Sequence, residues 1–221
     1  MNSLDNFILD FKSKSRHHNK LINFVYPELA KITKSNILEF GVSQKGMSTQ
    51  LFLEYSKINE CNLYSIDLID YSKKFENHNW NFIQSRDDNI SYIRENIPEK
   101  FKLIFLDTIH EAKHVKNIIY LYYDLLDVNS CFFIDDISWL PYTSNSEKNN
   151  FYCEINNLET FEILLDIYNN NQINFNIEFN FEGTGMCKLT KLNSKKLNQP
   201  KTVTLRKYTI KNFIRKILKK K

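Results

Sequence analysis

Long apolar runs are absent from this 221-residue sequence, although 42% of its residues are hydrophobic and it contains 17 Phe and 12 Tyr. No stretch approaches the roughly 20 consecutive apolar residues that a membrane-spanning helix needs. The first residues, MNSLDNFILDFKSKSRHH, lack the continuous apolar segment and small-residue cleavage site of an export signal. We therefore expect a soluble, cytoplasmic protein that can build one full hydrophobic core.

Cysteine and glycine are also scarce, with four residues of each. The cysteines form no Cys-x-x-Cys pair, which predicts reduced core thiols rather than a zinc site or a disulfide framework. They are Cys61, Cys131, Cys153 and Cys187. The motif G-x-G-x-x-G is absent, which argues against NAD or FAD as a cofactor.

Acids are missing from the last 21 residues, 201–221, which contain nine of the 30 Lys and Arg residues. The rest of the chain has 21 bases and all 26 acids, so its body is acidic and we expect no nucleic-acid partner. Within the basic tail, 194–221, apolar residues recur at helical spacing and predict a short amphipathic helix. Such a helix could make weak contact with a membrane surface or dock on an acidic partner. Its apolar residues are Ile210, Phe213, Ile214, Ile217 and Leu218.

Apolar periodicity predicts two opening helices, followed by short β-rich runs that alternate with helical ones. The predicted strands are 36–40, 62–66, 81–84, 103–106, 131–134, 173–181 and 186–192. The predicted helices are 4–11, 21–30, 48–57, 87–95, 111–126 and 151–169. This order predicts an α/β fold with a Rossmann-like, doubly wound seven-stranded sheet, mostly parallel, with an antiparallel strand in a C-terminal hairpin. One domain spans 1–193, and its first 33 residues are expected to form a cap or a homodimer face.

Two of the glycines, Gly41 and Gly46, lie in one loop between the first predicted strand and its helix. Glycine allows a ligand to approach the backbone closely, and the free N–H groups of the following helix favour a nucleotide-like ligand. Ser48 or Thr49 is expected to cap that helix. Asp67 ends the second strand 21 residues after Gly46, where a carboxylate can accept hydrogen bonds from a ribose. Each feature alone also fits an ordinary turn, but the pair predicts a cofactor site.

Five segments resemble, in order and spacing, the motifs of class I S-adenosylmethionine-dependent methyltransferases. ILEFGVSQKGMST resembles the first motif, LYSID the acidic second and NFIQSRDD the third, which lines adenine. LIFLDTIH and FFIDDI resemble the fourth- and fifth-strand motifs of a small-molecule and sugar O-methyltransferase subgroup. The resemblance covers about 36–137. It implies an O-methyltransferase with S-adenosylmethionine as cofactor and a small-molecule acceptor, most simply a sugar hydroxyl of a glycan or glycoconjugate.

The resemblance also implies roles for individual residues. Glu39, Gly41 and Gly46 would hold the methionine part of the cofactor, and Asp67 would hold the ribose. The remaining predicted cofactor residues are Val42, Ser48 and Thr49 and, around the adenine, Ser85, Arg86 and Asp87.

Three carboxylates, Asp107, Asp135 and Asp136, are predicted at the rim where the fourth and fifth strands end. Like charges this close need a shared proton or a hard divalent cation. In the sugar O-methyltransferases that the chain resembles, equivalent acids bind a metal that holds the acceptor hydroxyls, so these three residues are the predicted Mg²⁺ ligands. Asp135 and Asp136 could instead cap a loop.

His110 is the candidate catalytic base, with Asp107 beside it, because imidazole takes up a proton readily near neutral pH. It could instead order its own loop. Trp139 and Tyr142 could cover the acceptor or form a surface clasp.

Two alternatives compete with methyl transfer. The run His110-Glu111-Ala112-Lys113-His114 matches H-E-x-x-H, the helical motif of zinc hydrolases. Lys113 and the lack of any later histidine weigh against this alternative. The second alternative is a non-catalytic module that binds a membrane or a partner through the basic tail.

Overall fold

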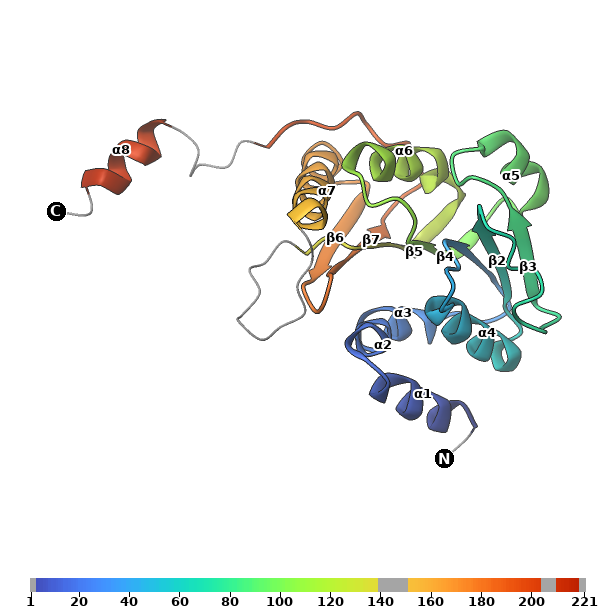
Figure 1. Ribbon diagram of the computed structural model, residues 1–221. Helices are drawn as coiled ribbons and strands as arrows, with labels where there is room; N and C mark the ends of the chain where they lie inside the picture. Colours follow the sequence, from blue (N-terminus) through green and yellow to red (C-terminus); the bar gives the residue numbers. More distant parts are fainter. Residues whose placement is uncertain (1–2, 139–150, 204–209, 219–221) are drawn as a thin grey trace.

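The alternation of β-rich and helical segments produces a seven-stranded sheet with helices on both faces (Figure 1). The computed structural model describes residues 3–138, 151–203 and 210–218. The strands are β1 (Asn36–Phe40), β2 (Asn62–Asp67), β3 (Trp80–Gln84), β4 (Phe101–Leu106), β5 (Leu126–Asp135), β6 (Phe175–Asn180) and β7 (Met186–Lys191). Their order in the sheet is β3-β2-β1-β4-β5-β7-β6, and β7 runs antiparallel to both of its neighbours. This arrangement confirms the predicted fold.

Alternate strand residues separate the core into two layers. On β1, Ile37 packs with the layer that includes Phe52, whereas Leu38 packs with the layer that includes Ile118. The first layer is covered by α1 (Ser3–Ser13), α2 (Arg16–Lys20), η1 (Leu21–Val25), α3 (Tyr26–Leu29) and α4 (Met47–Asn59). The second layer is covered by α5 (Ile90–Asn96), α6 (Ala112–Tyr122), η2 (Tyr123–Leu125) and α7 (Phe151–Asn169). The carboxyl ends of the parallel strands therefore open onto one edge between the layers.

The largest difference between the predicted and observed strands lies in β5, which begins at Leu126 rather than near Cys131. Its first half includes exposed Val128 and Asn129, and Asn129 has a positive φ of 61°. The pairing with β4 shifts register in the same region, between Phe101 and Leu103. An irregular strand with exposed residues shows no apolar pattern, so the periodicity detected only its second half.

The N-terminal segment covers the sheet through its own apolar side chains. Phe11, Val25 and Leu29 are fully buried in the first layer. The segment thus packs on the first layer of the core, while a cap over the cofactor and a homodimer face both stay predictions. The same segment carries a buried lysine, Lys20, toward the edge of the sheet.

The C-terminal segment returns along α7 after the hairpin. The backbone N–H groups of Lys201 and Val203 donate to Asp166, on its carbonyl (3.0 Å) and Oδ1 (2.7 Å) respectively. A further helix, α8 (Ile210–Leu218), lies within the basic tail and stands apart from the body in Figure 1. None of the helices in the described ranges has the length and apolar character needed to cross a bilayer. Trp139 and Tyr142 lie outside the described residues.

Candidate active site

The first glycine of the loop after β1 lies where two strand ends approach each other closely. Gly41 has φ +94°, and a Cβ atom at this position would lie 1.9 Å from the carbonyl oxygen of Asp107, directly after β4. Only glycine satisfies both the positive φ and the close contact. The loop backbone therefore lies directly against the end of β4, and no side chain at this position fills the space at the edge of the sheet.

Glu39 is the one charged residue of β1, and it is completely buried. Its carboxylate accepts hydrogen bonds from the hydroxyls of Ser48 (2.6 Å), Thr49 (2.9 Å) and Ser65 (2.6 Å). Burial raises the pKa of Glu39 to about 7, although these hydroxyl donors oppose the shift. Glu39 therefore ties α4 and β2 to β1 from beneath the loop.

The predicted helix cap is wrong. Helix α4 begins after Gly46, which adopts the left-handed conformation, and no side chain caps its first turn. Ser48 and Thr49 donate to Glu39 because a buried carboxylate needs hydrogen-bond donors more than an exposed helix end does.

Asp67 holds the loop from the neighbouring strand. Its Oδ2 accepts hydrogen bonds from the backbone N–H groups of Val42 (2.9 Å) and Ser43 (3.3 Å), and its Oδ1 accepts one from Ile69 (2.9 Å). The carboxylate is therefore oriented by the backbone at the end of β2, as a ribose-binding residue must be.

A cavity of about 280 Å³ opens beside this carboxylate. Its walls come from the ends of β1, β2, β3 and β4, and six of the predicted site residues line it. They are Gly41, Asp67, Ser85, Arg86, Asp87 and Asp107. Glu39, Val42, Gly46 and Thr49 do not line this cavity but support the loop around it.

The residues predicted to flank adenine differ in how they are held. Asp87 Oδ2 accepts hydrogen bonds from Thr108 Oγ1 (2.5 Å) and pairs with His114 Nε2 (2.7 Å), and this contact raises the pKa of His114. Arg86 instead forms a two-point contact with Asp88 (3.0 and 2.9 Å) on the surface. Thr108 and His114 are therefore supporting residues that the sequence did not reveal.

The H-E-x-x-H alternative does not fit the geometry. Helix α6 begins at Ala112, so His110 precedes it and cannot share a helical face with His114. His110 faces Asp107 and Asp136, whereas His114 pairs with Asp87. The zinc-hydrolase alternative is therefore wrong.

The predicted acidic rim is present where β4 and β5 end. His110 Nε2 lies 3.6 Å from Asp107 Oδ1 and 3.4 Å from Asp136 Oδ2. Burial and the charges of Asp135 and Asp136 raise the pKa of Asp107 well above its ordinary value. Burial and the charge of Asp135 likewise raise the pKa of Asp136. The rim is thus a crowded set of acids around one imidazole.

A lysine that the sequence analysis did not single out supplies the counter-charge. The Lys20 ammonium is 1% exposed and donates to Asp135 Oδ1, to Thr184 Oγ1 (2.9 Å) and to the carbonyl of Gly185 (3.2 Å). In the sequence, Lys20 stands in a polar run that reads as a solvated helix face. Its role depends on the contact between the N-terminal segment and the β6–β7 hairpin, which are far apart in the sequence.

A second cavity of about 120 Å³ lies over this rim. It is lined by Lys20, Asp135 and Asp136, together with His17 and Ser48. Ser43 and Asp107 line both this cavity and the larger one, so the two hollows adjoin at these residues. Asp107 therefore stands at the boundary between the two cavities.

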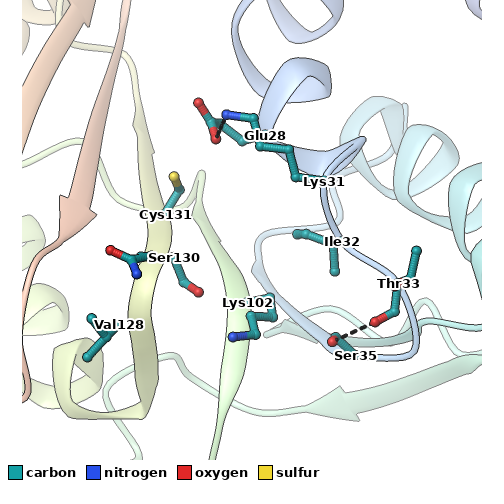
Figure 2. Close-up of a pocket in the computed structure, with 10 residues that line it drawn as sticks. Glu28, Lys31, Ile32, Thr33, Ser35, Lys102, Val128, Ser130 and Cys131 are labelled. Carbon is teal, nitrogen blue, oxygen red and sulfur yellow. Dashed lines mark hydrogen bonds and ion pairs between the residues drawn. The ribbon is translucent and has the colours of Figure 1, made fainter.

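A further hollow of about 400 Å³ contains none of the predicted site residues (Figure 2). It lies between the turn after α3 and the irregular first half of β5, near Lys31, Thr33 and Val128. These residues lie before β1 or in the first half of β5, whereas the acids lie at the carboxyl ends of β4 and β5. This hollow is therefore separate from the candidate active site.

Fold and site together place the chain among structures with the class I methyltransferase fold. No protein-family model matches the chain, and no curated protein sequence is similar to it. Among solved structures, it is similar to the MycE methyltransferase of the mycinamycin pathway in complex with Mg, SAH and mycinamycin VI. The identity is 15% and the TM-score 0.61, over 87% of this chain and 56% of MycE. The chain thus spans little more than half the length of MycE.

Two further structures are covered more fully. SAH-bound PaMTH1 from Podospora anserina is 12% identical with a TM-score of 0.61, over 87% of this chain and 89% of that one. A putative caffeoyl-CoA O-methyltransferase from Staphylococcus aureus is 17% identical with a TM-score of 0.58, over 86% and 93%. These likenesses confirm the methyltransferase fold that the motifs implied.

Proposed function

We propose that this chain is an S-adenosylmethionine-dependent O-methyltransferase that acts on a hydroxyl of a small acceptor, a sugar of a glycan or glycoconjugate. The observation that carries the proposal is the pair of adjoining cavities that share Asp107. One cavity has the residues expected for a nucleoside, and the other has acids and an amine suited to a polar acceptor. Methyl transfer requires this arrangement, because donor and acceptor must meet in line.

The larger cavity fits the cofactor. Asp67 is oriented at one side of it, and Gly41 keeps the loop backbone close against the end of β4. MycE and PaMTH1, which share the fold, are described in complex with SAH, the product form of this cofactor. Bound S-adenosylmethionine would supply a methyl group on a positively charged sulfur.

His110 lines neither cavity itself, but its ring lies beside Asp107 at their boundary, and it is the proposed base for deprotonation of the acceptor. As the acceptor oxygen forms its bond to the methyl carbon, the carbon–sulfur bond breaks and the hydroxyl proton must leave. His110 accepts that proton in this proposal, and the carboxylates of Asp107 and Asp136 stabilise the imidazolium that results. Asp107 also lies next to the donor cavity, so it orients the acceptor toward the methyl group.

In the described arrangement a lysine, rather than a grouped set of metal ligands, faces the rim. Within 3–138, 151–203 and 210–218, no three His, Cys, Asp or Glu side chains are grouped as metal ligands. The Lys20 ammonium already contacts Asp135. Mg²⁺ at Asp107, Asp135 and Asp136 therefore stays a prediction, and the mechanism proposed here uses Lys20 as the counter-charge.

The chemistry of the smaller cavity favours a sugar hydroxyl. Carboxylates accept hydrogen bonds from hydroxyls, and Asp107, Asp135 and Asp136 all line the cavity, so it can pair with several hydroxyls of one acceptor. MycE, crystallised with mycinamycin VI, shares this fold. These points support a hydroxylated acceptor over a purely aromatic one.

Calorimetric titration with S-adenosylhomocysteine tests the cofactor. Wild type should bind with micromolar affinity, and Asp67→Asn should weaken binding about tenfold, the loss expected for a charged hydrogen bond. Asp70→Asn is the matched control, because Asp70 is an exposed acid three residues further along the same loop. A well-folded wild type that does not bind would overturn the proposal. Positive binding would be followed by a screen of sugar and phenol acceptors with a labelled methyl donor.

A further inference from the structure

Helix α8 presents an apolar face that nothing covers in the described part of the chain. Its apolar side chains are 50–80% exposed: Ile210, Phe213, Ile214, Ile217 and Leu218. At about 100° per residue, these positions fall within an arc of about 140° on one side of the helix. An exposed apolar stripe of this kind marks an interaction surface.

The remainder of the circumference of α8 is cationic. By helical spacing Lys211 and Arg215 fall outside the apolar arc, at about 90° and about 130° from its centre, and Lys216 adjoins them in the sequence. No acid occurs anywhere in 201–221, whereas the rest of the chain has an excess of acids. The helix therefore combines an apolar stripe with a positive face, and its charge is opposite to that of the body.

We propose that α8 binds the surface of an anionic lipid bilayer, with its apolar stripe among the acyl chains and its cations at the headgroups. A polyanion such as RNA would engage the cations but leave the apolar stripe exposed. A bilayer matches both faces at once, and that is the argument for lipid. The inference goes beyond methyl transfer and does not depend on it.

The tether between α8 and the body limits the geometry of binding. Val203 is hydrogen-bonded to α7, and Ile210 begins α8 seven residues later. A fully extended chain of that length spans about 25 Å, so a bound α8 would keep α7 within that distance of the bilayer. The body has an excess of acids, which an anionic surface does not attract, so the helix is the expected point of contact.

Flotation of the full chain with lipid vesicles tests the inference. Phosphatidylcholine vesicles with and without about one-third phosphatidylserine supply the anionic and neutral surfaces. Wild type should float with the anionic vesicles and not with the neutral ones. High salt, about 0.5 M NaCl, should release a large part of it.

Two double variants separate the contributions of the two faces. Phe213→Asn with Ile217→Asn should abolish flotation. Lys211→Gln with Arg215→Gln should weaken partition on the order of 30-fold, since each cation near such a surface contributes roughly fivefold. The matched control is Ile58→Asn with Ile173→Asn, which removes two comparably exposed apolar residues from the body and should float like wild type. Melting temperatures confirm that each variant folds.

Three outcomes would overturn the inference. Wild type could fail to float with anionic vesicles, or the Phe213 and Ile217 variant could float as wild type does. The third is a concentration-dependent dimer, measured by light scattering, that depends on Phe213 and Ile217 and forms without vesicle binding. That result would assign the stripe to a second copy of the chain.

Discussion

A methyl group added at Gly41 meets the backbone of Asp107, directly after β4, rather than a side chain that could move aside. The new Cβ would lie 1.9 Å from the carbonyl oxygen of Asp107 and 2.8 Å from its carbonyl carbon. The positive φ of 94° adds backbone strain of about 1–3 kcal/mol for alanine. Forcing two strand ends apart adds a further 1–3 kcal/mol, as overpacking does in a core. Gly41→Ala should thus destabilise the fold by about 4 kcal/mol.

Gly183→Ala is the matched control. Gly183 also has a positive φ, of 60°, but an added Cβ there meets no atom within 4 Å. Only the conformational strain remains, about 1–2 kcal/mol. For a chain of this length, melting falls by about 2–4 °C per kcal/mol, so Gly41→Ala should melt about 12 °C lower and Gly183→Ala about 4 °C lower.

Thermal unfolding followed by circular dichroism measures both variants. S-adenosylhomocysteine binding should also weaken in Gly41→Ala at a temperature where it remains folded, because the displaced loop carries the Val42 and Ser43 amides that orient Asp67. Equal melting temperatures for the two alanine variants would show that the loop relaxes freely, and the close approach of β1 and β4 would then not shape the site.

Three further predictions concern buried charges. Glu39 keeps its proton in the folded chain up to about pH 7 but loses it near pH 4.5 when unfolded, so its contribution to stability declines as pH rises between these values. The stability difference between wild type and Glu39→Gln, from urea unfolding, should fall by about 3 kcal/mol across that window, and parallel curves would contradict the assignment. The pKa of His114 is raised beside Asp87, so its contribution to the free energy of unfolding is full below pH 6.5 and is lost as pH rises through the pKa of the folded state. His114→Gln should remove this pH dependence of stability. An unchanged pH profile in the variant would refute the assignment. Lys20→Met removes the counter-charge of Asp135, so the variant should bind Mn²⁺, as measured by electron paramagnetic resonance. The control is Lys188→Met, which removes a buried lysine paired with Glu28 and should not bind Mn²⁺. Tight Mn²⁺ binding by wild type would instead support the predicted metal site.

The fold could be predicted because its signals are local. Strand residues such as those of β1 are continuously buried, and the residue at or just after the carboxyl end of each strand reaches the same edge of a parallel sheet. Asp67, Asp107 and Asp135 could therefore be placed together from sequence position alone, and the structure brings them to that edge.

The parts that could not be predicted depend on contacts between distant segments. Lys20 acquires its role from a carboxylate 115 residues away and a turn 165 residues away. Ser48 and Thr49 look like helix caps until the burial of Glu39 is known. His110 and His114 look like one motif until the start of α6 separates them.

The antiparallel direction of β7 has a consequence for how the chain folds. Because β7 begins where β5 ends, the turn before it reaches the rim, where the Gly185 carbonyl accepts the Asp136 amide (3.1 Å) and the Lys20 ammonium. Contacts this distant in sequence carry a high loop-closure cost and form late. During synthesis the half of the sheet that contains β1 to β4 can assemble first, whereas Lys20 finds its partners only after the hairpin has docked. The order of folding would thus leave the acidic rim exposed and repulsive until the final strand inserts.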